Sequence, residues 1–402
     1  MGDAEQLIVR VEPEIAAIAA QDWDACANPG APEFRAAHPY NPFISHAFLN
    51  ALETSGCVAA GTGWAPQHLV LDDSTGRVLA CMPCYLKSHS MGEYVFDYAW
   101  ADAYERAGGR YYPKLQSSVP FTPVTGRRLL VPPCEHAGRR EQYLVSAAVE
   151  LMNRQEVSSL HITFPTKPEW ERLGEMGLLQ RTDQQFHWVN DGYNTFDDFL
   201  DSLTSRKRKT IRKERREAYG EDLEVEWVTG ADLSEDHWDA FYEFYLDTGA
   251  RKWGSPYLNR TFFSQIGETM ADKLLLVVCH RNGRFIAGAL NFIGGDTLYG
   301  RYWGCREDQK FLHFEVCYYQ AIEFAIANGL RVVEAGAQGP HKLSRGYLPQ
   351  TTHSAHYIAD DGLRRGVEQF LTRERAYVEM ENQALATHAP FRCGDKPERD
   401  ES

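Results

Sequence analysis

KLLLVVCHRNGRFIAGALNFIGGDTLYGRYWGC (residues 273–305) is the stretch of sequence that decides the fold. Two apolar runs, residues 273–280 and 284–293, are joined by Arg281-Asn282-Gly283, which is typical of a β-hairpin turn. A third run at residues 297–305 alternates in polarity as a half-buried strand does. The stretch therefore predicts three consecutive strands.

The flanking sequence supplies helices on both sides of these strands. Helical spacing of apolar residues predicts helices at residues 238–248, 261–270 and 314–327, and the last of these ends at Asn328-Gly329. A short strand at residues 331–335 follows. Strands that alternate with helices in this way predict an α/β fold.

The first half of the chain repeats the same order. Strand-like runs at residues 67–71 and 77–87 are joined by a turn sequence, and a helix at residues 140–154 precedes a strand at residues 159–164. We therefore predict two tandem domains with mixed, mostly antiparallel sheets flanked by helices. Their predicted bounds are 1–190 and 191–385, with a basic helix at 200–218 and a flexible tail at 386–402.

Composition limits the classes of protein to consider. The 402 residues carry a formal net charge of −14, and the composition is that of a globular protein. Apolar runs such as residues 274–279 are far shorter than a membrane helix. Nine cysteines without framework spacing, and a start without a basic and then apolar block, indicate a cytoplasmic protein with reduced thiols.

One segment is strongly basic within this acidic chain. Residues 206–216, RKRKTIRKERR, hold eight basic residues and one acidic residue. Such a helix is either a solvated charged face or a cradle for phosphate groups of a nucleotide-linked substrate or RNA. The predicted anion-binding residues are Arg206, Arg208, Lys209, Arg212 and Arg216.

A second unusual segment is EAGAQGPHKLSRGY (residues 334–347), a glycine-rich loop at the end of a predicted strand. α/β proteins place ligands at such strand ends, although the loop could equally be only a polar connection. The polar residues that we single out there are Glu334, Gln338, His341, Lys342, Arg345 and Tyr347.

Further candidates surround that loop. Tyr299, Arg301 and Trp303 alternate along the third strand and so share one face. His313 and Glu315 stand at the start of the next helix, where an acidic residue could also serve only the helix dipole. Together these side chains predict a general acid–base site, because His and a partly desolvated Glu can titrate near neutral pH.

The first half has its own polar cluster directly after a strand. We expect its members to line a groove between the halves, with an exposed rim as the alternative. They are Lys87, His89, Glu93, Asp97 and Lys114.

Neither metal nor hydrolase patterns are evident. The histidines lack the spacing of a zinc site, and Cys81 and Cys84 are expected to be core thiols. No GxSxG elbow is present.

Four stretches carry a family resemblance: YLKSHSMGEYVFDYAWADAYERAGGRYYPKLQSSVPFTPVTG (85–126), SRKRKTIRKER (205–215), LHFEVCYYQAIEFAI (312–326) and VEAGAQGPHKLSRGYLPQTTHSAHYI (333–358). They resemble the FemAB-like N-acyltransferases of the GNAT superfamily, which act in bacterial peptidoglycan biosynthesis and recognition. The resemblance extends from about residue 41 to about residue 380. It implies two GNAT-like domains and transfer of an acyl group to an amine.

The resemblance also suggests a mechanism by direct attack. The donor would be an acyl-CoA or an aminoacyl-tRNA, no cofactor would be tightly bound, and the acceptor would be a small-molecule or peptide amine. Glu334 or His341 would take the amine proton, Tyr347 would protonate the leaving group, and backbone N–H groups near residues 303–305 would polarise the carbonyl. The alternative is a non-catalytic GNAT-like module that binds an anionic ligand or RNA through the basic helix.

Overall fold

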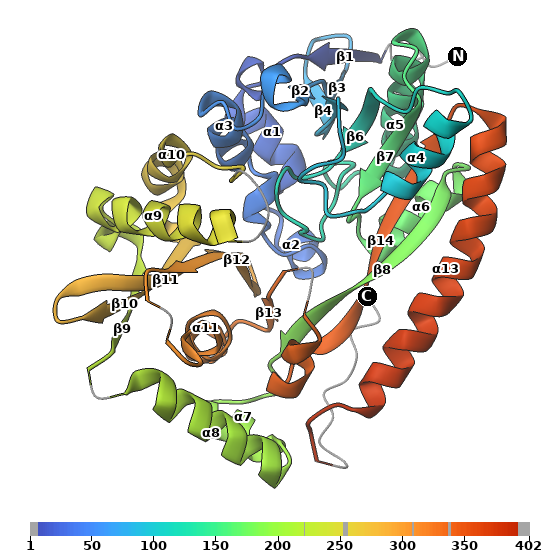
Figure 1. Ribbon diagram of the computed structural model, residues 1–402. Helices are drawn as coiled ribbons and strands as arrows, with labels where there is room; N and C mark the ends of the chain where they lie inside the picture. Colours follow the sequence, from blue (N-terminus) through green and yellow to red (C-terminus); the bar gives the residue numbers. More distant parts are fainter. Residues whose placement is uncertain (1–6, 221, 252–255, 308, 337–338, 393–402) are drawn as a thin grey trace. The chain divides into compact units, whose positions relative to one another are not determined.

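The computed structural model describes residues 7–220, 222–251, 256–307, 309–336 and 339–392. The chain forms two compact units (Figure 1). The first contains the residues up to Asp183 together with Thr351–Glu379, and the second contains Gln184–Gln350 and the residues from Met380 onward.

The second unit is built around the stretch that opened the sequence analysis. The strand β12 pairs with β11 and β11 with β10, all antiparallel, as the hairpin signals predict. β9 extends the sheet at one end, and β13 lies parallel to β12 at the other. These strands are β9 (Glu224–Thr229), β10 (Leu274–Arg281), β11 (Arg284–Ile293), β12 (Thr297–Cys305) and β13 (Val332–Glu334).

Helices flank this sheet. α9 contacts β11 and β12, and the predicted helix at 314–327 occurs as two α-helices joined by a wider π-helical turn at Glu315–Tyr319. The helices of this unit are α7 (Phe196–Ser202), α8 (Ser205–Tyr219), α9 (Glu235–Arg251), α10 (Arg260–Met270), α11 (Leu312–Phe314) and α12 (Gln320–Ala327).

The first unit contains a three-stranded antiparallel sheet and a larger mixed one. The small sheet has the order β1 (Ile8–Glu12), β3 (His68–Asp72), β4 (Val78–Met82). The larger sheet is formed by β2 (Trp64–Pro66), β5 (Tyr85–Lys87), β6 (Lys114–Ser117), β7 (Ser159–Thr163) and β14 (Leu348–Ile358), and its β6–β7 pair is parallel.

Helices of the first unit complete its core. α5 contacts β3, β4, β6 and β7, and its buried apolar side chains belong to the same core cluster as those strands. The helices are α1 (Ala20–Ala27), α2 (Pro32–Ala37), α3 (His46–Thr54), α4 (Tyr98–Arg106), α5 (Ala137–Arg154), α6 (Lys167–Glu175) and α13 (Asp361–Thr387), whose last residues belong to the second unit.

The duplicated order is visible in both units. Each contains a strand, a helix and a second strand parallel to the first: β6, α5, β7 in one and β12, α11–α12, β13 in the other. Such strand–helix–strand units with parallel strands are the core of α/β architecture. The predicted α/β fold with mixed, mostly antiparallel sheets is confirmed.

The predicted domain bounds need correction, because two strands are exchanged between the halves of the sequence. β8 (Leu179–Val189) begins in the first unit and pairs with β13 of the second. β14, near the end of the chain, pairs with β7 of the first unit. Residues 351–379, which we placed in the second domain, therefore belong to the first unit.

The basic helix is also shorter than predicted. The chain is not helical at Leu203 and Thr204, because Leu203 pairs with Phe391 and the Thr204 N–H donates to the Pro390 carbonyl at 2.9 Å. The basic helix α8 thus starts at Ser205 and not at residue 200. Of the predicted tail at 386–402, residues 393–402 lie outside the described residues.

Candidate functional site

In the second unit, the parallel strands β12 and β13 separate at a defined point. Their pairing covers three residues and ends with Tyr299 opposite Glu334. β13 stops there, whereas β12 continues to Cys305. The side of β12 that faced β13 is thereby left open from Gly300 onward.

A β-bulge lies at the same point. On β12, Gly300 pairs with Asn291 and Tyr302 pairs with Leu290, so Arg301 is the extra residue of the bulge. Beyond it the Arg306 N–H donates to the Ile286 carbonyl of β11 at 2.8 Å. Because N–H directions alternate along a strand, those of Trp303 and Cys305 point away from β11, towards the open side.

A pocket of about 230 Å³ occupies this opening. Five predicted site residues line it, from three separate segments of sequence: Arg301, Trp303, His313, His341 and Lys342. The rest of its lining is Ala289, Leu290, Asn291, Gly300, Tyr302, Cys317, Tyr318 and Ala335.

Lys342 lines the pocket and is hydrogen-bonded to the backbone of the glycine-rich loop. Its side chain is buried, and Nζ donates hydrogen bonds to the carbonyls of Ala335 at 2.6 Å and Gly336 at 2.8 Å. Burial, and then the nearby Arg301 guanidinium, lower the pKa of Lys342 to about 8. The Glu334 carboxylate raises this pKa, but its effect is weaker. The amine can therefore exchange a proton near neutral pH.

Glu334 forms a buried ion pair with Arg301. The Arg301 guanidinium donates to Glu334 Oε1, and both side chains are almost completely excluded from solvent. His187 Nε2 of β8 lies 4.0 Å from the other carboxylate oxygen. Glu334 thus holds Arg301 at the pocket and does not itself line it.

A hydrogen bond of 2.9 Å joins the Tyr318 hydroxyl to His341 Nε2. His341 is exposed, and the ring of His313 packs against Trp303 with centroids 4.8 Å apart. Tyr347, by contrast, is completely buried, and its hydroxyl donates to the Tyr318 carbonyl at 3.4 Å. Tyr318 and not Tyr347 is the phenol that reaches the pocket.

Two other predicted site residues, Tyr299 and Glu315, do not line the pocket. Tyr299 is buried under the Arg301 guanidinium, 5.2 Å from its ring centroid. Glu315 is buried and accepts hydrogen bonds from Arg215 of α8, the shortest at 2.9 Å. Gln338 lies outside the described residues.

Arg345 also points elsewhere. Its guanidinium donates to both carboxylate oxygens of Glu214 of α8, at 3.0 and 2.9 Å, and stacks on Phe314. It also donates to the His341 carbonyl at 2.9 Å. Arg345 therefore supports the turn that carries His341 and Lys342.

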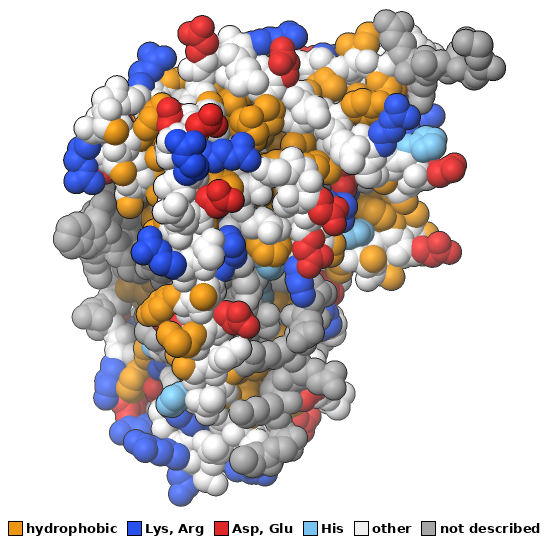
Figure 2. Space-filling view, turned by 90° about the vertical axis from the view of Figure 1, so that its right-hand side faces the viewer, with side chains coloured by type: hydrophobic (Ala, Val, Ile, Leu, Met, Phe, Trp, Pro, Cys, Tyr) orange, Lys and Arg blue, Asp and Glu red, His pale blue; other side chains and the backbone are white. Residues whose placement is uncertain are grey.

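The predicted anion-binding residues of α8 divide into two sets. Arg208 and Arg212 form ion pairs with Asp201 and Asp197 of α7, which neutralise them. The other three side chains are exposed and make no ion pair with any described residue; we call them the exposed basic triad: Arg206, Lys209 and Arg216. Basic side chains also gather along the lower edge of the view in Figure 2, the level at which Figure 1 draws α8.

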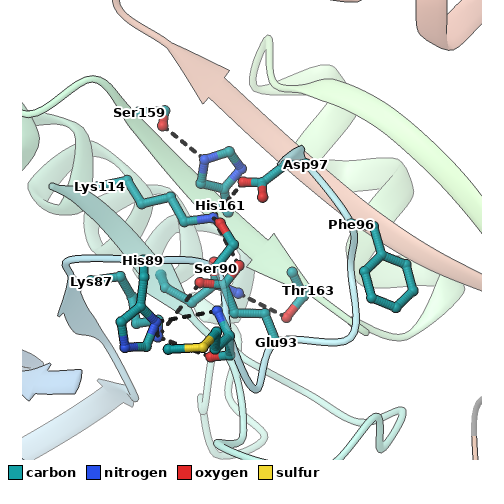
Figure 3. Close-up of polar contacts among 12 residues, drawn as sticks. Lys87, His89, Ser90, Glu93, Phe96, Asp97, Lys114, Ser159, His161 and Thr163 are labelled. Atoms are coloured by element: carbon teal, nitrogen blue, oxygen red, sulfur yellow. Dashed lines mark hydrogen bonds and ion pairs between the residues drawn. The ribbon is translucent and has the colours of Figure 1, made fainter. Parts of the chain in front are cut away.

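The predicted cluster of the first half lies inside the first unit. Lys114 Nζ donates to Glu93 at 2.8 Å and to Asp97, and Lys87 Nζ lies 3.7 Å from Glu93 (Figure 3). His89, which is half-buried, contacts Lys87 Nζ at 3.4 Å. The four charged residues are almost fully buried, so the alternative of an exposed rim is wrong for them.

Sequence reasoning missed several residues of the pocket. Tyr318 and Cys317 stand at helical spacing in the predicted helix at residues 314–327, which gave no sign that they line a site. The wider turn at Glu315–Tyr319 rotates them towards the pocket. Asn291 sits on β11 opposite Gly300, where a side chain on the glycine would meet its amide oxygen at 3.2 Å.

The sequence matches a known family over residues 14–393, described by its role in peptidoglycan biosynthesis and recognition. The chain belongs to the FemAB-like family. No curated protein matches the sequence significantly.

Solved structures show that the FemAB-like chain shares its fold with distant proteins. FemX is 13% identical, with a TM-score of 0.54 over 87% of this chain and 98% of FemX. A conserved protein of unknown function from Bacteroides thetaiotaomicron is 9% identical, with a TM-score of 0.51 over 88% and 100% of the two chains. A putative lysylphosphatidylglycerol synthetase C-terminal domain from Agrobacterium fabrum is 9% identical, with a TM-score of 0.50 over 82% and 92%.

Two further properties concern the described residues of this FemAB-like chain. None of the helices there combines the length and the apolar character needed to cross a membrane. No group of three or more His, Cys, Asp or Glu side chains is arranged to hold a metal ion.

Proposed function

We propose that this protein transfers an acyl or aminoacyl group to an amine acceptor in the pocket between β12 and β13. The observation that carries the proposal is the opening itself: two parallel strands separate beside a bulge, and a lysine with a lowered pKa lines the space. Membership of the FemAB-like family supports an acceptor of the peptidoglycan-precursor type.

The carbonyl of the donor requires polarisation during attack. The N–H groups of Trp303 and Cys305 are directed to the open side of β12, where an oxyanion can accept their hydrogen bonds. Preorganised donors of this kind are worth about 2.7–4 kcal/mol each. The guanidinium of Arg301, fixed by Glu334, adds positive charge beside the same site.

The acceptor amine must lose a proton as it attacks. Neutral Lys342 can take that proton, since its two N–H donors to the loop carbonyls leave its lone pair available. The leaving group is a thiol or a ribose hydroxyl, and the Tyr318–His341 pair can return a proton to it. Lys342 therefore replaces Glu334 and His341 as our candidate base, and Tyr318 replaces Tyr347 as the acid.

The donor is either an acyl-CoA or an aminoacyl-tRNA. Both carry phosphates, and the exposed basic triad on α8 offers three cations for them. α8 is tied to the pocket by the buried Glu214–Arg345 and Arg215–Glu315 ion pairs.

Two parallel assays test the proposal. One follows thiol release from acyl-CoAs and the other follows deacylation of labelled aminoacyl-tRNA, each with a primary-amine acceptor and the purified chain. We expect amine-dependent turnover in one arm and its loss in Lys342→Met, with Lys310→Met of the same unit as a control because that lysine is exposed. Absence of turnover in both arms would refute the proposal.

A second function is favoured by the exposed basic triad alone. A non-catalytic module would use these cations to bind RNA, and its affinity would fall steeply with salt. Salt-dependent RNA binding without turnover in either arm would support this alternative.

A further inference from the structure

Asn291 is a buried amide in the wall of the pocket between β12 and β13. It stands between apolar residues of β11 and is only 1% exposed. It nevertheless lines the pocket, together with Gly300, Ala335 and Lys342. Burying an amide in an apolar strand costs free energy unless its polar atoms find partners. None of the steps of the proposed transfer reaction uses this side chain, so its place at the pocket calls for an explanation.

The amide nitrogen of Asn291 is held by two backbone carbonyls. Nδ2 donates to the Ala289 carbonyl at 3.2 Å and to the Leu275 carbonyl of β10 at 3.4 Å. Because carbonyl oxygens accept hydrogen bonds and do not donate them, the nitrogen and not the oxygen of the amide must face these two groups. The orientation of the amide is thereby fixed, and Oδ1 is directed away from both carbonyls.

Oδ1 of Asn291 faces Gly300 of β12. A methyl group on Gly300 would lie 3.2 Å from Oδ1 and 3.7 Å from the Glu334 carbonyl oxygen. Since the glycine carries no side chain, position 300 leaves this oxygen uncovered. Both hydrogen bonds that Asn291 forms with described residues use Nδ2, and Oδ1 accepts none from them. A buried acceptor that lacks a donor and lines a pocket indicates that a ligand supplies the donor.

Lys342 provides a second acceptor in the same pocket. When the amine is neutral, the lone pair of Nζ can take a proton, because its N–H groups donate to the Ala335 and Gly336 carbonyls. Ala335 also borders the space in front of Oδ1, since its Cα lies 4.0 Å from the methyl position on Gly300. One residue therefore contacts Nζ of Lys342 and adjoins the space next to Oδ1 of Asn291.

A primary amine has the N–H groups that these two acceptors need. The neutral molecule carries one lone pair and two N–H groups. As the lone pair attacks the acyl carbonyl, one N–H can donate to Lys342 and the other to Oδ1 of Asn291. A secondary amine has a single N–H, which Lys342 requires. It would turn an alkyl group towards the buried oxygen and leave that oxygen without a hydrogen bond.

We propose that Asn291 selects primary amines as acceptors, by accepting a hydrogen bond from the N–H that the reaction does not remove. The proposal rests on the proposed transfer reaction and adds the class of acceptor. A C–N bond forms, the bond from the carbonyl carbon to the sulfur or oxygen of the donor breaks, and one proton passes from the amine to Lys342. The leaving group receives a proton from the Tyr318–His341 pair. The product is a secondary amide, whose remaining N–H stays on Oδ1.

Two acceptors that differ by one methyl group test the selection. Glycinamide is the primary amine and sarcosinamide is its N-methyl derivative, and each is supplied with the donor that gives turnover in the paired assays. The unaltered chain should show a kcat/KM about 10–100-fold higher for glycinamide, as expected when a buried acceptor is left without a donor. Equal values for the two amines would overturn the role of Asn291 and leave the transfer reaction standing. Absence of turnover with either amine would refute the transfer reaction, and the selection with it.

Asn291→Leu separates selection from packing. Leucine has the same branching as asparagine, and its neighbours in β11 are already apolar. The variant should lose about tenfold in kcat/KM for glycinamide and little for sarcosinamide, so the ratio of the two values should fall towards one. A variant that is only destabilised contains less folded protein, which lowers both values equally and preserves the ratio. A ratio equal to that of the unaltered chain would contradict the assignment.

The pH dependence distinguishes contact with the amine from an indirect effect on Lys342. The amide of Asn291 is uncharged, so Asn291→Leu should leave the pH profile of glycinamide turnover in place, governed by the Lys342 pKa of about 8. Asn153→Leu, on the exposed side of α5 in the first unit, is the control and should match the unaltered chain in rate, ratio and profile. A shifted profile in Asn291→Leu would show that Asn291 acts through Lys342 and would overturn the proposal.

Discussion

Lys342→Met is the perturbation that most directly tests the chemistry. Lys342 is buried beside Arg301, and its pKa falls from 10.5 to about 8. At pH 7 about a tenth of the side chain is neutral, and at pH 8 about half. If this amine is the base, kcat/KM rises with pH and levels off above about 8. A general base contributes about 10²–10⁴-fold, and the variant should lose that factor.

Stability should change far less, because two effects of the ammonium oppose each other. A pKa lowered by about 2.5 units means that the proton costs the folded state about 3 kcal/mol. Against this, Nζ donates to the Ala335 and Gly336 carbonyls, and hydrogen bonds from a charged group stabilise by about 1.5–3 kcal/mol each. The two hydrogen bonds together contribute about 3–6 kcal/mol, so the variant should be destabilised by between about zero and 3 kcal/mol at pH 7, which thermal unfolding measures.

The pH dependence of stability has a definite sign. Below pH 8 the lysine is protonated in both states, so its cost to the folded state is fully present. Between pH 8 and 10.5 the folded state loses the proton first, and stability rises with pH relative to Lys342→Met. The measurements are initial rates from pH 6 to 9 and thermal unfolding from pH 7 to 10. A flat rate profile, or full activity of the variant, would refute the role of Lys342 as base.

Three further perturbations probe the surroundings of the pocket. Gly304→Ala should destabilise the folded chain by about 1–3 kcal/mol, since the new methyl group would lie 2.1 Å from the Phe244 carbonyl oxygen. Chemical denaturation measures this change, and an unchanged midpoint would contradict the close packing of Gly304. Arg345→Met should cost about 3–5 kcal/mol because it leaves the buried Glu214 carboxylate without its cationic partner, and the double variant with Glu214→Gln should recover part of the loss in the same measurement. Neutralising the exposed basic triad with glutamine should raise the KM for a phosphate-bearing donor and reduce its salt dependence without altering kcat at saturation, whereas Lys310→Gln should change neither.

Local patterns in the sequence predicted the elements that depend on neighbouring residues. β11 and β12 have the predicted bounds, because a hairpin turn and an apolar alternation are encoded within a few residues. The exchange of β8 and β14 is not encoded locally. β13 pairs with a strand more than a hundred residues earlier in the chain, and no periodicity reveals such a partner.

The candidate site was predictable to a similar extent. Glycine-rich sequence after a strand indicated the loop of His341 and Lys342, and both line the pocket. Choosing between Tyr318 and Tyr347 required the π-helical turn, which shifts the face presented by the helix. The sequence also did not show which charged residues pair with one another and so cannot contact a ligand. Glu315 pairs with Arg215 of α8, and Arg345 pairs with Glu214 of the same helix.

The two units show how a duplicated scaffold acquires unlike sites at equivalent strand ends. In the second unit a bulge at Arg301 and the early end of β13 open a pocket beside β12. In the first unit Gln116 and Ser117 of β6 remain paired with β7, and a loop with inward carboxylates covers the polar face instead. Strand separation leaves backbone N–H groups of β12 available to a substrate, whereas continued pairing of β6 with β7 occupies the corresponding backbone groups in the first unit. The duplicated strand–helix–strand order therefore leads to an open strand end at β12, which carries the candidate transfer site, and to a closed, ion-paired one at β6.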